Sequence, residues 1–99
     1  MTGLIKYEFT SSLWSQASTM SWHFVSLPEE TSKEIRALLR SQEEGWGRLK
    51  ATAKIGGSEW KTAIWFDTKR NTYLLPVKAT IRSKENLRVG VEIETIIWV

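Results

Sequence analysis

Few side chains in this sequence are of the kinds that carry acid–base or nucleophilic chemistry. His23 is the only histidine, Asp67 is the only aspartate, and cysteine is absent. A Ser-His-Asp triad would have to join these two residues, and a metal site built from several histidine or cysteine ligands is excluded. His23 alternates with Trp22 and Phe24 along a predicted strand, so we expect it on the outer face. Asp67 opens a predicted turn, where aspartate is favoured for local backbone hydrogen bonds.

Paired carboxylates are the other arrangement suited to acid–base catalysis. They occur at Glu29–Glu30, Glu43–Glu44 and Glu92–Glu94. The first pair suits a helix start, the second a loop, and the third the solvent face of a strand. We therefore expect no catalytic, metal or cofactor site, and we expect the protein not to be an enzyme.

Basic residues are concentrated in the middle of the chain. The net charge is −2 over residues 1–46, +7 over residues 47–88 and −2 over residues 89–99. Four cations are candidates for a nucleic-acid contact: Arg48, Lys50, Lys54 and Lys61. The first three recur at alternate positions of one strand, and a basic strand face with Trp46 or Trp65 nearby could follow a phosphate backbone and stack bases. The alternative is that these cations only solvate the outer face of a barrel and block edge pairing.

The elements that would position these side chains are mostly strands. Apolar and polar residues alternate over residues 4–14 and 47–55, and residues 21–27, 59–66, 73–82 and 91–99 are predicted to be extended as well. Gly56-Gly57 is a two-residue hairpin signal, and Pro76 implies an edge, a bend or a bulge within its segment. These segments predict about seven strands.

One helix is predicted between the second and third strands. Pro28 suits its first turn, Glu29 and Glu30 match the positive end of its dipole, and it should end near residues 40–42. Thr31 and Glu34 have the spacing of a capping box, so the helix could instead start there. Residues 83–86 are expected to form a turn or a short helical piece.

The composition fits one small globular domain. The chain has 99 residues, of which 41% are hydrophobic and 25% charged, and six are tryptophan. It shows no signal peptide and no apolar run long enough to span a membrane, and the lack of cysteine suits a reducing compartment. We expect one domain over residues 1–99 in the cytoplasm. The apolar residues 96–99 are expected to form a core strand. If they formed an edge strand instead, they could pair with a second copy of the chain, and the sequence is compatible with a monomer or a homodimer.

A set of short motifs extends over most of the chain. In order they are Trp22-x-Phe24-Val25-x-Leu27-Pro28, Gly45-Trp46-Gly47, Ala53-x-Ile55-Gly56, Trp60-x-Thr62, Leu75-Pro76-Val77-Lys78, Ile81-Arg82 and Gly90. In order and spacing they resemble the DUF1905 family, a family of domains of unknown function. The resemblance implies a double-split β-barrel closed by helical segments. It also implies a domain often followed by a helical bacteriocin-protection (OmpD-associated) domain, which this sequence lacks.

The most recognisable family segments contain five residues suited to a ligand site. They are Trp22, Trp60, Tyr73, Lys78 and Arg82. If the two cations point toward a cleft floored by tryptophan, the site suits a small anionic or aromatic ligand. The alternative is that the rings are core and the cations lie at its rim. We predict an all-β fold with one helix, in the form of a small closed or double-split barrel. We expect the protein to be a non-catalytic binding or interaction module. Its partner could be nucleic acid or a small anionic ligand, and we expect no membrane partner.

Overall fold

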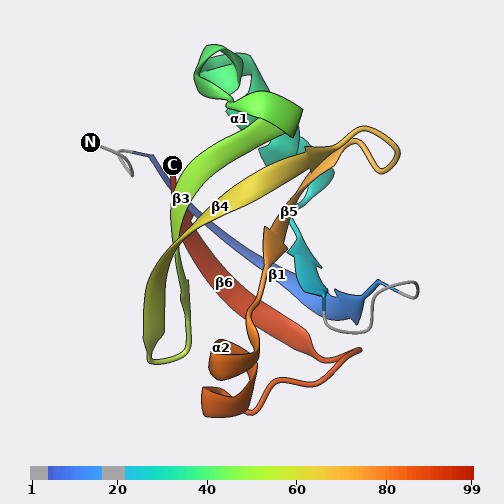
Figure 1. Ribbon diagram of the computed structural model, residues 1–99, viewed down its shortest axis with the longest axis vertical. Coiled ribbons are helices and arrows are strands. Elements are labelled where there is room, and N and C mark those ends of the chain that lie inside the picture. Colours follow the sequence, from blue (N-terminus) through green and yellow to red (C-terminus); the bar gives the residue numbers. More distant parts are fainter. Residues whose placement is uncertain (1–4, 17–21) are drawn as a thin grey trace.

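Six antiparallel strands close into a barrel in the order β1-β2-β5-β4-β3-β6. The computed structural model describes residues 5–16 and 22–99 (Figure 1). The strands are β1 (Lys6–Ser15), β2 (His23–Ser26), β3 (Arg48–Ile55), β4 (Ser58–Asp67), β5 (Thr72–Pro76) and β6 (Glu92–Trp98). The helices are α1 (Glu29–Leu39) and α2 (Ala79–Lys84), with 3₁₀ turns η1 (Arg40–Gln42) and η2 (Gly45–Gly47).

The β3–β4 hairpin follows directly from its sequence. Leu49, Ala51, Ala53 and Ile55 are buried and alternate with more exposed polar residues, the pattern of a strand with one face on a core. The strands join at Gly56-Gly57, and Gly56 has a φ of +58°, a conformation that glycine adopts without a Cβ penalty. All eight residues of β3 pair with β4, from Arg48 with Trp65 to Ile55 with Ser58.

Helix α1 covers one end of the barrel (Figure 1). It begins after Pro28, as predicted, and buries Ser32, Ile35 and Leu39 along one stripe. The Ser32 hydroxyl accepts a hydrogen bond of 3.0 Å from the backbone N–H of Tyr73 in β5. The helix is thus attached to the barrel by a buried polar contact in addition to its apolar stripe.

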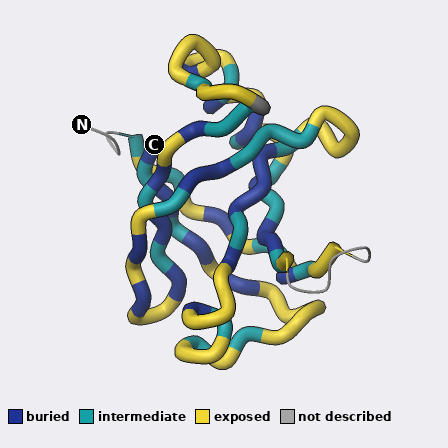
Figure 2. The backbone as a smooth tube through the Cα atoms, in the orientation of Figure 1, coloured by how far each residue is buried: buried dark blue, intermediate teal, exposed yellow. Residues whose placement is uncertain are grey.

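The core is a single cluster inside the barrel, and Figure 2 shows the buried positions alternating along the strands. Val25, Ile35, Ile64, Leu75 and Ile97 are fully buried within it. Strand β6 lies between β1 and β3, so the apolar C-terminal segment is a core strand, as expected, and not a free edge. No helix among the described residues has the length and apolar character needed to cross a membrane.

The structure has six strands among the described residues, where about seven were predicted, and the segment 73–82 is only half extended. Strand β5 ends at Pro76, and residues 79–84 form α2. The backbone N–H groups of Ile81 and Arg82 both bond to the carbonyl of Lys78, each at 3.1 Å. Pro76 still pairs with Phe24 of β2, and the Val77 N–H donates to the His23 carbonyl at 2.9 Å before the chain turns into the helix.

The face predicted for His23 is also wrong. Val25, two residues further along β2, is fully buried in the core, whereas Phe24 pairs with Trp14 of β1 on the outside of the barrel. His23 is on the Val25 side and half-buried. The aromatic residues misled the prediction because Phe24 is buried by other rings on the outer surface, 5.0 Å from Trp14 and 5.9 Å from Trp22 between ring centroids.

Candidate functional site

A hollow lies where β4 and β5 separate. The two strands pair only through Trp65–Asp67 and Thr72–Leu74, so the first part of β4 pairs with β3 alone. The opening has a volume of about 530 Å³, which lies within the size range of small-molecule sites. We call it the split cleft. The described residues that line it are Trp22, His23, Trp60, Lys61, Thr62, Pro76, Val77, Lys78, Ala79 and Arg82.

Arg82 is held in place at this cleft by two contacts. Its Nε donates to the Val77 carbonyl at 3.2 Å, and its Nη1 lies 3.2 Å from Nε2 of His23. A guanidinium can only donate, so Nε2 of His23 accepts and the ring carries its proton on Nδ1. A short helix after a proline-terminated strand therefore brings Arg82 back onto β2, a contact between residues 59 positions apart.

The cleft is positively charged. Lys61, Lys78 and Arg82 line it, and no carboxylate does among the described residues. None of the three forms an ion pair within the described part of the chain. Cations with no counter-charge, beside apolar walls, favour an anion as the occupant.

Tryptophan rings form two walls of the cleft. Trp60 belongs to the core cluster and is only 9% exposed, so it serves as a fixed floor. Trp22 is 51% exposed and stacks on Phe24 with an interplanar angle of 12°. An exposed indole supported from below offers a flat face to a second ring or to a cation.

Four of the five predicted ligand residues therefore meet at one place, and Tyr73 does not. Tyr73 is fully buried on the α1 side, and its hydroxyl donates to the Glu43 carboxylate. Burial and the neighbouring Glu43 together raise the pKa of the Tyr73 hydroxyl well above its usual value. Its neighbour Leu74 faces outward, so the alternation along β5 directs Tyr73 into the core, where it contacts Phe66 edge-on at 5.1 Å.

The four predicted nucleic-acid residues also separate into two groups. Arg48, Lys50 and Lys61 line a second hollow of about 470 Å³ on the outer face of β3 and β4. Trp65 lies in it as well, with the Arg48 guanidinium 5.8 Å from its ring centroid. The side chain of Trp46, the other ring expected there, lies outside the described residues.

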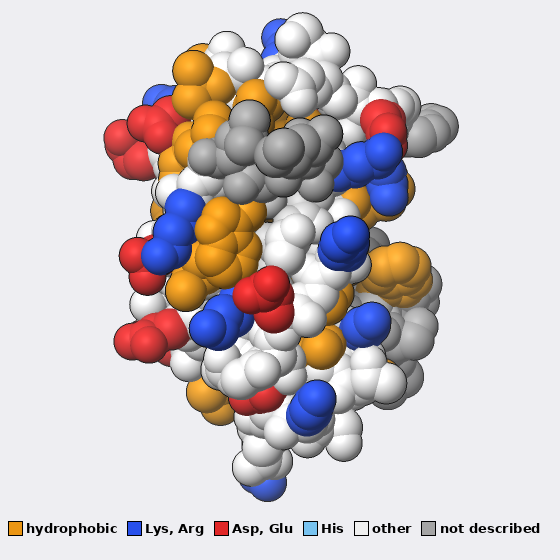
Figure 3. Space-filling model, turned by 90° about the vertical axis from the view of Figure 1, so that its left-hand side faces the viewer, with side chains coloured by type: hydrophobic (Ala, Val, Ile, Leu, Met, Phe, Trp, Pro, Cys, Tyr) orange, Lys and Arg blue, Asp and Glu red, His pale blue; other side chains and the backbone are white. Residues whose placement is uncertain are grey.

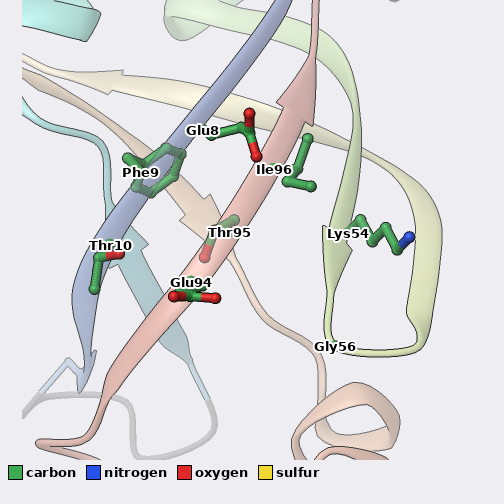
Figure 4. A pocket seen from close by; sticks show the side chains of 8 residues that line it. All are labelled: Glu8, Phe9, Thr10, Lys54, Gly56, Glu94, Thr95 and Ile96. Atoms are coloured by element: carbon green, nitrogen blue, oxygen red, sulfur yellow. The ribbon is translucent and has the colours of Figure 1, made fainter.

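Lys54 belongs to a different surface. It lines a hollow between β1, β6 and the β3–β4 hairpin together with Glu8 and Glu94 (Figure 4). Figure 3 shows basic and acidic side chains interspersed around hydrophobic atoms on one face of the barrel, without a continuous basic patch there. The predicted row of cations along β3 therefore does not act as one surface.

Asp67, which was considered with His23 for a triad, makes hydrogen bonds within its own turn. Asp67 Oδ1 accepts the backbone N–H of Lys69 at 2.9 Å, and Oδ2 accepts Arg70 Nη1 at 2.7 Å. Partial burial would raise the pKa of this carboxyl, but these hydrogen bonds outweigh it and lower the pKa below its usual value. The carboxylate thus stabilises its own turn. No cluster of three or more metal-ligating side chains occurs in residues 5–16 and 22–99.

Sequence reasoning missed several residues of the split cleft. His23, Thr62, Pro76, Val77 and Ala79 line it, and none was among the predicted ligand residues. The signal that could have found His23 was the inward phase of Val25, which places His23 on the same side of β2.

The barrel and its cleft define the class of protein before any comparison: a small antiparallel barrel with a cationic, tryptophan-walled opening between two strands. A family model described as Domain of unknown function (DUF1905) matches residues 9–97, and the chain belongs to this family. No curated protein matches the sequence.

Proposed function

We propose that this protein is a non-catalytic binding module that holds a small anionic ligand carrying a flat ring in the split cleft. The observation that carries the proposal is the meeting of Arg82, Lys78 and Lys61 with two tryptophans around one hollow of 530 Å³. The cations supply attraction for phosphate or carboxylate, and Trp22 supplies a face for the ring. We also propose a cytoplasmic location, since a cysteine-free sequence suits a reducing compartment.

A non-catalytic role is supported by what the titratable groups contact. The Nε2 of His23 lies 3.2 Å from the Arg82 guanidinium, which can only donate, so the lone pair of that nitrogen is engaged. The fixed guanidinium is suited to recognition, because its donors are oriented before the ligand arrives.

The test is titration with adenosine monophosphate, adenosine, indole-3-acetate and inorganic phosphate, followed by tryptophan fluorescence and thermal unfolding. Adenosine monophosphate should quench the tryptophan fluorescence, and both ring-bearing anions should raise the melting temperature, because a ligand present at 100 times its Kd stabilises the fold by about 2.7 kcal/mol. Neutral adenosine and ring-free phosphate should each bind at least about tenfold more weakly, since each lacks one of the two contacts.

Two variants separate the cleft from general charge. Arg82→Ala should abolish the response, whereas Lys84→Ala removes the same charge from an exposed position of α2 outside the cleft and should leave it unchanged. Equal loss in both variants, or no response to either ring-bearing anion at millimolar concentration, would overturn the proposal.

A further inference from the structure

The split cleft adjoins the second hollow, on the outer face of β3 and β4. Trp22, Lys61, Thr62 and Pro76 line both. Their volumes of 530 and 470 Å³ together reach the upper end of the size range of small-molecule sites. We call the two together the trough.

The second hollow repeats the chemistry of the first. It has one tryptophan of its own, Trp65, and two further cations, Arg48 and Lys50. Ala63 of β4 and Pro76 of β5 also line it. A ring wall with cations beside it therefore occurs twice along the trough, with Lys61 shared between the two halves.

The charge of the trough is strongly one-sided. Five cations line its two halves, and no carboxylate does among the described residues. The one carboxylate in contact is Glu44, which pairs with Arg48 and lies 3.9 Å from Lys50. Glu44 carries one negative charge against the two positive charges of Arg48 and Lys50, so this half keeps a positive charge beside Trp65, in addition to Lys61, Lys78 and Arg82.

We propose that the trough binds single-stranded nucleic acid, with one base on Trp22, a neighbouring base on Trp65 and the backbone along the cations. Two aromatic walls in a basic channel are the arrangement by which proteins bind single strands without reading sequence. The inference rests on the proposed function, because the split cleft forms one half of the trough.

The experiment measures competition against a fluorescein-labelled thymidylate octamer by anisotropy. The competitors are unlabelled thymidylates of one, two, four and eight nucleotides, a uridylate octamer and polyphosphate. Affinity should rise at least about fivefold from the monomer to the longer oligomers, because each stacked base contributes about 1–3 kcal/mol. The affinity should also fall as the salt concentration rises. The logarithm of the binding constant plotted against the logarithm of the salt concentration should have a slope of about −0.7 for each phosphate contact. The uridylate octamer, which differs in the 2′-hydroxyl and the base methyl, should compete about as well as the thymidylate octamer, because stacking on Trp22 and Trp65 requires neither group.

Variants assign each half of the trough. Trp65→Leu should remove the gain with length and leave monomer binding intact, whereas Arg82→Ala should weaken both. If Trp65→Leu disturbs folding, Lys50→Ala is the alternative variant, because Lys50 is exposed. It should also reduce the gain in affinity with length and leave monomer binding intact. Lys54→Ala is its matched control: the same charge on the same strand, four residues away, beside Glu8 and Glu94.

The outcomes separate the two proposals. A gain with length that depends on Trp65 or Lys50 but not on Lys54 supports the trough. A monomer that competes as well as the octamer overturns it and leaves the proposed small-ligand site standing. Polyphosphate that competes as well as the octamer also overturns it, because the rings then add nothing to the attraction between charges. No competition by any nucleotide also overturns it. Titration with indole-3-acetate, the ring-bearing anion that is not a nucleotide, then tests the small-ligand site separately.

Discussion

Arg82 Nη1 lies 3.2 Å from Nε2 of His23, and this contact ties α2 to β2 at the mouth of the split cleft. The sole histidine of the chain thus contacts a cation through Nε2. Together with the Val77 carbonyl it fixes the direction of the guanidinium. His23 is therefore a positioning residue for Arg82 in the proposed site.

Replacing His23 should weaken ligand binding through Arg82. His23→Ala removes one hydrogen bond, worth about 1 kcal/mol, so affinity for adenosine monophosphate should fall about fivefold. His23→Gln keeps an acceptor and should restore most of that loss. Isothermal titration of the three proteins checks this, and a His23→Gln variant as weak as His23→Ala would show that the contact does not orient Arg82.

The alternation of side chains predicted most of the fold, because a strand with one face on a core repeats every two residues. It placed Leu49 and Ile55 inside correctly. It failed at His23 and Phe24, where the rings of Trp14 and Trp22 bury Phe24 on the outer surface and imitate a core position. The alternation of residue types indicates which positions of a strand are buried. It does not indicate whether the core or side chains on the outer surface bury them.

The site was predicted in part for a related reason. Lys78 and Arg82 were expected near Trp22 and Trp60, and the structure brings them together. What no local pattern could show is α2, a six-residue helix whose position depends on contacts to distant strands. The separation of β4 from β5 is likewise a property of long-range pairing, which the sequence of neither strand contains.

Removing the Ser32 hydroxyl should destabilise the fold. It accepts the Tyr73 backbone N–H in a buried place, so Ser32→Ala leaves that donor without a partner and should cost about 1–3 kcal/mol. Urea denaturation measures the change. Ser41→Ala, at an exposed position of η1, is the control and should stay within about 0.5 kcal/mol. If Ser32→Ala and Ser41→Ala changed the free energy of unfolding equally, the hydrogen bond between Ser32 and Tyr73 would not stabilise the fold.

Stability should fall in alkaline solution because of Tyr73. Its folded-state pKa is raised above the unfolded value of about 10. Above that pH the unfolded chain releases the Tyr73 proton while the folded chain keeps it, so the free energy of unfolding decreases as pH rises. Below that pH the contribution of Tyr73 to stability is fully present. Urea midpoints between about pH 8 and 11 test this. Tyr73→Phe should show a shallower alkaline decline, and an unchanged slope would contradict the assignment.

Gly56 and Gly57 should respond differently to the same substitution. Gly56 has a φ of +58°, and a Cβ there would lie 2.0 Å from Oε1 of Glu85, whose Oε2 accepts the Ser58 hydroxyl at 2.6 Å. Gly56→Ala must therefore adopt a left-handed conformation, at about 1–2 kcal/mol, and also displace Glu85 from Ser58. At Gly57 the nearest atom would be 4.0 Å away and φ is not in this region, so Gly57→Ala should cost much less.

A Glu85→Ala background separates the two costs at Gly56. With the carboxylate removed, the collision disappears, and Gly56→Ala should cost only the backbone strain. Thermal or urea unfolding of the four proteins in this double-mutant cycle gives the coupling free energy directly. If Gly56→Ala costs the same with and without Glu85, then α2 does not hold the β3–β4 hairpin through this carboxylate, and the hairpin depends on its own pairing alone.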